Sequence, residues 1–130
     1  MATVETGLYK SEDGNFSINV TSSNGGRGKF EGTYTAVSIF DSPEISDEKA
    51  DGHFQFVGKS WQVPFCVEFE VRSRPGEPEA WPYAIFDSWV GVYEDADGLQ
   101  MRMEGVRSYV TDAGTAAPSH LGERVFKLQA

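Results

Sequence analysis

The feature that most constrains this chain is the alternation of apolar and other residues over residues 61–72. One parity holds Trp61, Val63, Phe65, Val67, Phe69 and Val71, and the other holds Gln62, Pro64, Cys66, Glu68, Glu70 and Arg72. Successive side chains of a β-strand point to opposite faces, so this pattern predicts a strand with one buried face. Pro64 cannot donate to a neighbouring strand, and a bulge or a strand entry near it would accommodate it.

A second stretch predicts a β-hairpin. Residues 28–35 read Gly-Lys-Phe-Glu-Gly-Thr-Tyr-Thr, with Phe30, Gly32 and Tyr34 on one parity. The preceding Ser-Asn-Gly-rich residues 22–28 are typical of a tight turn, because Gly adopts positive φ without strain. Gly32 marks a bend or a close backbone approach within the hairpin.

Short alternating segments recur along the whole chain, and no helical stripe persists. They predict about eight strands, at residues 6–11, 15–21, 28–36, 52–58, 61–73, 81–93, 99–110 and 122–129. Residues 40–50 lack periodicity and residues 111–120 are rich in Ala, Gly and Pro, so both are expected to be loops. Hairpin-joined antiparallel strands close readily into an up-and-down barrel. We therefore expect one all-β domain, residues 1–130, an eight-stranded antiparallel barrel whose lumen can hold a small ligand.

Composition and charge argue against several classes of binding partner. The net charge is −9 and the pI is about 4.6, which argues against nucleic acid and anionic membranes as partners. No apolar run approaches the ~20 residues of a membrane helix. The first five residues carry neither a basic patch nor an apolar segment, so no secretory signal is expected in this chain, and both secretion and a cytoplasmic location stay open.

Reactive residues are sparse. The single cysteine, Cys66, excludes an internal disulfide, and a packed thiol is favoured over pairing between chains. His53 and His120 lie far apart and no Cys-x-x-Cys is present, so neither a metal nor a cofactor is expected. Residues 94–98 superficially resemble a calcium loop but lack its ligand spacing, which favours a solvated turn. No nucleophile elbow occurs, and catalysis is not favoured.

Aromatic residues are the remaining candidates for a site. Those expected to point mostly inward are Tyr9, Phe16, Phe30, Tyr34, Phe65, Phe69, Tyr83, Trp89 and Phe126. Such a set either fills a core or walls a ligand pocket, and periodicity alone favours core filling.

The order of the motifs resembles the avidin and streptavidin family. Residues 6–18 are similar to its first hairpin, residues 27–35 to its third strand, and the segments around Phe69, Trp89, residues 103–108 and residues 121–126 to later strands. The resemblance implies a barrel that binds biotin through polar groups and an aromatic cage. Tyr34 matches the tyrosine of the family's biotin site, and Ser11 occupies the position of its asparagine. Asn15 lies next to the position of its serine. Phe69 and Trp89 match two positions of the aromatic cage.

The remaining positions of the biotin site depart from the family pattern. Glu104, or Met103, occupies the position of a tryptophan of the family's aromatic cage. Residues 116–117 occupy the position of the tryptophan that a neighbouring subunit contributes in that family. Arg124 lies near the position of an Asn or Asp that accepts hydrogen bonds from biotin. Asp87 replaces a small hydroxyl residue. Asp87, Arg124 and Glu104 would have to pair or stay hydrated in a lumen, because an unpaired buried charge is costly. Biotin affinity is therefore expected to be weakened or lost.

Three functions follow as hypotheses. The first is a non-catalytic barrel, dimeric or tetrameric, that binds biotin or another small polar-aromatic molecule. Its binding residues would be Tyr9, Ser11, Asn15, Tyr34, Phe69, Asp87, Trp89, Glu104 and Arg124. The second is a small cyclase or isomerase with Asp87 or Glu104 as acid-base group. The third is a structural or interaction module whose aromatic residues fill the lumen.

Overall fold

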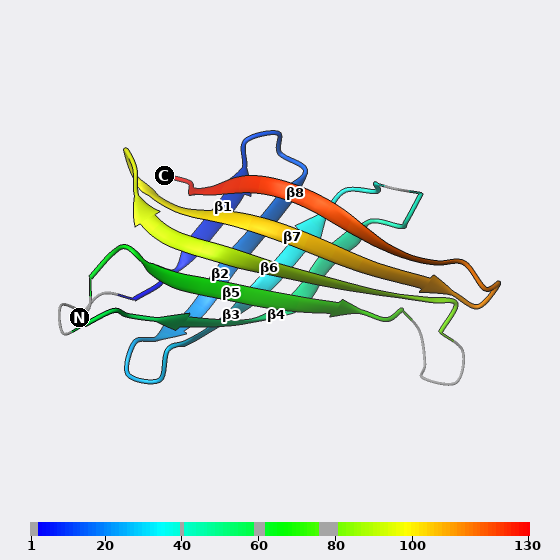
Figure 1. Ribbon diagram of the computed structural model, residues 1–130, viewed down its shortest axis with the longest axis horizontal. Coiled ribbons are helices and arrows are strands. Elements are labelled where there is room, and N and C mark those ends of the chain that lie inside the picture. The colour runs from blue at the N-terminus through cyan, green and yellow to red at the C-terminus, as the bar shows by residue number, and fades with distance from the viewer. Residues whose placement is uncertain (1–2, 40, 59–61, 76–80) are drawn as a thin grey trace.

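The computed structural model describes residues 3–39, 41–58, 62–75 and 81–130, and these form a closed eight-stranded antiparallel barrel (Figure 1). The strands are β1 (Gly7–Ser11), β2 (Phe16–Asn24), β3 (Lys29–Ala36), β4 (Ile45–Gln55), β5 (Phe65–Ser73), β6 (Tyr83–Asp95), β7 (Leu99–Thr111) and β8 (Ala116–Leu128). Each strand pairs with the next, and β8 pairs back with β1. The all-β, up-and-down prediction is confirmed.

The alternation that predicted β5 is confirmed in the structure. Phe65, Val67, Phe69 and Val71 are buried, whereas Cys66, Glu68, Glu70 and Arg72 are exposed. β5 begins at Phe65, so Pro64 precedes the ladder and needs no N–H there. Residue 61, where this strand was expected to begin, lies outside the described residues. The packed thiol expected for Cys66 is wrong, because its parity places it on the outer wall.

Two strands begin earlier than predicted. β4 starts at Ile45 rather than at residue 52, and β8 starts at Ala116 rather than at residue 122, so much of each expected loop is strand. The register shifts between Tyr34 and Ala36 where β3 meets β4, and between Gly105 and Val106 where β7 meets β8. Such irregularities change the parity of buried residues within a strand. The strand then lacks the regular alternation of buried and exposed residues by which strands are predicted from sequence.

The interior of the barrel is built from large side chains. The largest with almost no exposed surface are Trp89, Arg107, Tyr9, Tyr34, Tyr93, Phe16, Phe69 and Phe126. Of the aromatic residues expected inside, Tyr83 is only partly buried and packs against Tyr109. The described residues include no helix long and apolar enough to cross a membrane.

The structure confirms the close backbone approach expected at Gly32, in the hairpin of β2 and β3. A Cβ at Gly32 would collide with the backbone carbonyl of Asn19 on β2. Gly32→Ala is therefore expected to lower the free energy of unfolding by about 1–3 kcal/mol, as overpacking does. Gly26→Ala is the matched control, since its Cβ would approach nothing closer than Asn24 Oδ1 at 3.5 Å. Urea unfolding of both variants checks this, and equal stabilities would contradict the steric explanation.

Candidate functional site

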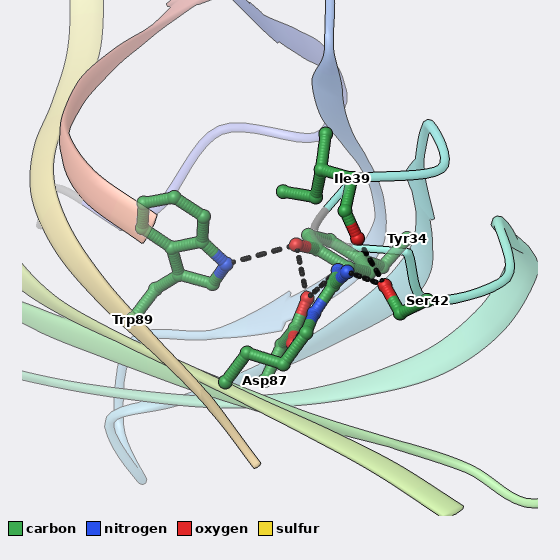
Figure 2. Close-up of polar contacts among 6 residues, drawn as sticks. Tyr34, Ile39, Ser42, Asp87 and Trp89 are labelled. Carbon is green, nitrogen blue, oxygen red and sulfur yellow. Dashed lines mark hydrogen bonds and ion pairs between the residues drawn. The ribbon is translucent and has the colours of Figure 1, made fainter. Parts of the chain in front are cut away.

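The residues expected to hold a ligand contact one another directly. The rings of Tyr34 and Phe69 lie 5.8 Å apart between centroids, and those of Phe69 and Trp89 lie 6.4 Å apart. The indole Nε1 of Trp89 donates to the Tyr34 hydroxyl at 3.0 Å (Figure 2). Aromatic rings at 4.5–7 Å are in packing contact, so the space predicted for a ligand is filled by the side chains themselves.

Trp89 is enclosed from several directions. Phe16 and Phe126 approach its ring edge-on, with centroids at 5.2 Å and 5.0 Å. A Cβ on Gly105 of β7 would come within 2.7 Å of the indole, so the ring lies directly over this glycine. Trp89 thus occupies the position of a central core residue.

A buried ion pair lies beside this aromatic group. Arg107 on β7 donates from Nε to Asp87 Oδ1 and from Nη2 to Asp87 Oδ2, both at 2.7 Å. Arg107 also faces Asp87 in the strand register. Tyr34 donates its hydroxyl to Asp87 Oδ2 at 2.8 Å, as Figure 2 shows. Because the Asp87 and Arg107 side chains are 0% and 1% exposed, each charge is compensated inside the barrel.

Arg107 connects the ion pair to the segment between β3 and β4. Its Nη1 donates to Ser42 Oγ at 2.7 Å, and Ser42 Oγ donates to the carbonyl of Ile39 at 2.6 Å. Figure 2 shows Ile39 above Tyr34, and Ser42 below it to the side of Asp87, with a dashed line from Ser42 to Ile39. This segment therefore covers one end of the barrel. Its Ser42 hydroxyl is the hydrogen-bond acceptor for Nη1, the guanidinium nitrogen of Arg107 that does not contact Asp87.

Two groups of this cluster, Arg107 and Tyr34, have raised pKa values. Burial by itself would lower the pKa of Arg107, but the hydrogen bonds and the negative charge of Asp87 raise that pKa above its ordinary value. Burial raises the pKa of Tyr34 well above its ordinary value, and Asp87 acts in the same direction. Arg107 therefore stays charged and Tyr34 stays protonated in the folded chain.

The opposite end of the barrel is covered by the first described residues. Val4 has no exposed surface. Tyr9 donates its hydroxyl to the Glu5 carbonyl at 2.7 Å, while the Glu5 N–H donates to the Tyr93 hydroxyl at 3.1 Å. The two hydroxyls lie 2.8 Å apart, and Tyr93 donates to Tyr9 because the Tyr9 proton is already used. Tyr9, expected at a ligand, thus binds the chain itself.

The other predicted site residues lie apart from this cluster. Ser11 ends β1 and Asn15 lies in the turn before β2, where Ser11 Oγ and the Asn15 N–H both donate to Asp13 Oδ1. Arg124 lies over the Phe16 ring, with its Nε 3.5 Å from Asp13 Oδ2. Glu104 is exposed on the outer wall. Asp87, Arg124 and Glu104 were expected to pair or stay hydrated if all three faced the lumen, and they do not all face it. Arg107 supplies the partner of Asp87 instead.

Sequence reasoning missed Arg107. A signal was present, because Arg107 shares parity with the inward-facing Met101, Met103 and Gly105 of β7. An arginine is nevertheless among the residues least often buried, and its partner is twenty residues away in the sequence. Only the register of β6 against β7 brings the two together.

The buried tyrosines predict a specific alkaline behaviour. Burial raises the pKa of Tyr9, Tyr34 and Tyr93 above the ordinary value, so the folded state holds these protons after the unfolded state would release them. Their contribution to stability is therefore present below about pH 10 and is lost as the pH rises further. We expect ultraviolet absorbance to show these three tyrosines ionising only together with unfolding, followed by circular dichroism. Ionisation of all five tyrosines in the intact fold would contradict this.

The described residues contain no group of three or more His, Cys, Asp or Glu side chains placed to bind a metal ion. Surface hollows lie on the outer wall over β4, β5 and β6, where His53, Glu68 and Val90 line two of them.

Comparisons of the chain with protein-family models, with curated proteins and with solved structures gave no match.

Proposed function

We propose that this protein is a structural or interaction module, a barrel whose lumen is a filled core and not a ligand pocket. The observation that carries the proposal is the direct contact among Tyr34, Phe69 and Trp89. A ligand between these rings would have to separate them and break the Trp89–Tyr34 hydrogen bond. It would bring no new apolar burial in return, since these side chains are already buried.

The closure of both ends supports the same proposal. Ser42 binds Arg107 at one end, and the backbone of Glu5 binds Tyr9 and Tyr93 at the other. The polar groups that would orient a small ligand already have partners within the chain. A ligand would have to replace these bonds one for one, because an unpaired buried donor or acceptor costs about 1–3 kcal/mol.

We propose that any relation to the avidins is a divergent one in which the site residues changed their partners. Tyr34 and Trp89 remain at the family's positions, but in this chain they bind each other and Asp87. The same geometry gives no support to acid-base catalysis. Both oxygens of Asp87 already accept hydrogen bonds from Arg107, and the Glu104 side chain is exposed on the outer wall.

Calorimetric titration with biotin tests the proposal. With protein at tens of micromolar and streptavidin as a positive control, we expect no binding heat. A saturable heat that disappears in the Tyr34→Phe variant would place biotin in the lumen and overturn the filled core. Tyr34→Phe suits this purpose because it removes only the hydroxyl that bonds Asp87 and Trp89.

A further inference from the structure

The turn between β2 and β3 contains an Asn-Gly pair. Asn24 is the last residue of β2, its side chain is exposed, and residues 25–28 lead from it to the start of β3. Figure 1 shows this turn, in light blue, at the lower edge of the barrel. Three of the four residues that follow Asn24 are glycine, so few side chains can block a reaction between Asn24 and the backbone.

The reaction open to an Asn-Gly pair is deamidation through a cyclic imide. The Gly25 N–H gives its proton to a base in the solvent, and the nitrogen forms a bond to Cγ of Asn24. The bond from Cγ to the side-chain nitrogen breaks, ammonia leaves, and a five-membered succinimide ring closes. Water then adds to one of the two ring carbonyls and opens the ring to aspartate or isoaspartate. Water from the solvent is the co-reactant.

The nucleophile of this reaction is free at Gly25. Its N–H donates no hydrogen bond to any other residue that the structure describes. Two other glycines in turns follow an acidic residue, and their nitrogens are engaged. The Gly14 N–H donates to the Ser11 carbonyl at 2.9 Å, and the Gly98 N–H donates to Asp95 Oδ1 at 3.0 Å. Those two nitrogens must break a hydrogen bond before they can attack, whereas the Gly25 nitrogen need not.

The electrophile is polarised by a neighbouring backbone group. The Arg27 N–H donates to Oδ1 of Asn24 at 3.2 Å. When the Gly25 nitrogen bonds to Cγ, negative charge develops on this same oxygen. A donor already directed at the oxygen stabilises that charge, as the donors of an oxyanion hole do. The turn therefore holds both reacting groups in a favourable state.

The fold protects the other two asparagines of the chain. Asn15 is followed by Phe16, whose N–H donates to Ser11 Oγ at 3.0 Å. Asn19 lies in the middle of β2 and is followed by Val20, a buried β-branched residue that pairs with β1. Neither site combines a free nitrogen with the absence of a side chain beside it.

We propose that Asn24 is a site of spontaneous deamidation in the folded protein. This inference goes beyond the proposed function and does not depend on it. The aspartate product would lie opposite Lys29, the register partner of residue 24, and opposite charges at such positions attract. The isoaspartate product instead adds one carbon to the main chain where the ladder of β2 and β3 ends, so it shifts the last register pair.

Peptide mapping by mass spectrometry tests the inference on protein kept in warm, mildly alkaline buffer. We expect the folded chain to gain the mass that replaces NH by O at Asn24, and no gain at Asn15 or Asn19. Each rate constant is compared with that of the same site in the urea-unfolded chain, so the intrinsic effect of the neighbouring residue cancels. For Asn24 the folded and unfolded rate constants should agree within about tenfold, or about 1.4 kcal/mol in activation free energy.

Asp97→Asn provides a matched control within one polypeptide. It creates a second Asn-Gly pair in the turn between β6 and β7, where asparagine tolerates the φ of 58° found at Asp97. The Gly98 N–H is held there by Asp95. Folding should therefore slow deamidation at position 97 by more than about tenfold relative to the unfolded variant. Circular dichroism should show that the variant keeps the native fold.

Two results would overturn this inference. One is a folded chain that keeps the amide of Asn24 while the unfolded chain loses it, because the turn would then protect the residue. The other is the same ratio of folded to unfolded rate constants at both turns of the Asp97→Asn variant, because the free N–H of Gly25 would then have no effect. Neither result bears on the filled core, which the biotin titration tests separately.

Discussion

Arg107→Met is expected to destabilise the barrel by about 3–5 kcal/mol, because it leaves the carboxylate of Asp87 buried without its cation. Arg107 contributes two hydrogen bonds to Asp87 and a third to Ser42, all at 2.7 Å, from a side chain that is 1% exposed. Methionine fills similar volume but donates nothing. Urea unfolding monitored by circular dichroism measures the loss.

The same strand provides the control. Arg102 on β7 also forms two hydrogen bonds to a carboxylate, that of Glu94, but its side chain is 49% exposed. Arg102→Met should cost at most about 1 kcal/mol, as for other surface ion pairs. Adding Asp87→Leu to Arg107→Met should recover stability, since the unpaired charge is then removed. Equal losses for the two arginine variants would contradict the buried ion pair.

Trp89→Ala is expected to lower the free energy of unfolding by about 3–5 kcal/mol and to create a site for indole. The truncation removes a ring packed by Phe16, Phe69 and Phe126, and these leave an apolar cavity behind. Apolar cavities made in this way bind small aromatic molecules. Indole should therefore raise the melting temperature of the variant but not that of the native chain.

Trp81→Ala is the control for this experiment. Trp81 is only partly buried, with the Arg74 guanidinium 4.7 Å from its ring, so its removal opens no enclosed cavity. No stabilisation by indole is expected for this variant. If indole stabilised the native chain as strongly as it stabilises Trp89→Ala, the lumen would already contain open space and the filled core would be refuted.

The sequence predicted the architecture because its alternation is strong where strands are regular. β5 alternates without interruption, so its buried face could be read from Phe65 to Val71. The turns between strands contain Gly, Asn and Asp, which identified the hairpins. Strand number and hairpin connections together predicted closure, since a closed barrel leaves no unpaired edge.

The starts of β4 and β8 could not be predicted in the same way. In β4 the buried residues Ile45 and Ala50 are five positions apart, an odd spacing that regular alternation does not produce. In β8 the buried residues Leu121 and Phe126 have the same spacing. Register shifts against the neighbouring strands account for both, and such shifts depend on contacts far apart in the sequence.

Only some members of the candidate site were predictable from the sequence, and their contacts were not. Tyr34, Asp87 and Trp89 were identified from the sequence and do lie together. Whether a gap remains between such side chains depends on distances across the barrel, which no local pattern contains. Arg107 and Ser42 were not predicted as site residues, for a related reason. The role of Arg107 arises from the pairing of β6 with β7, and that of Ser42 from a loop that folds over the end of the barrel.

Native mass spectrometry of the freshly purified protein tests the filled lumen most directly. We expect the mass to equal that of the 130-residue polypeptide or a whole multiple of it, with no small molecule attached. An additional mass that is released on unfolding and is missing from the Trp89→Ala variant would show that the barrel carries a ligand, and the structural core proposed here would then be wrong.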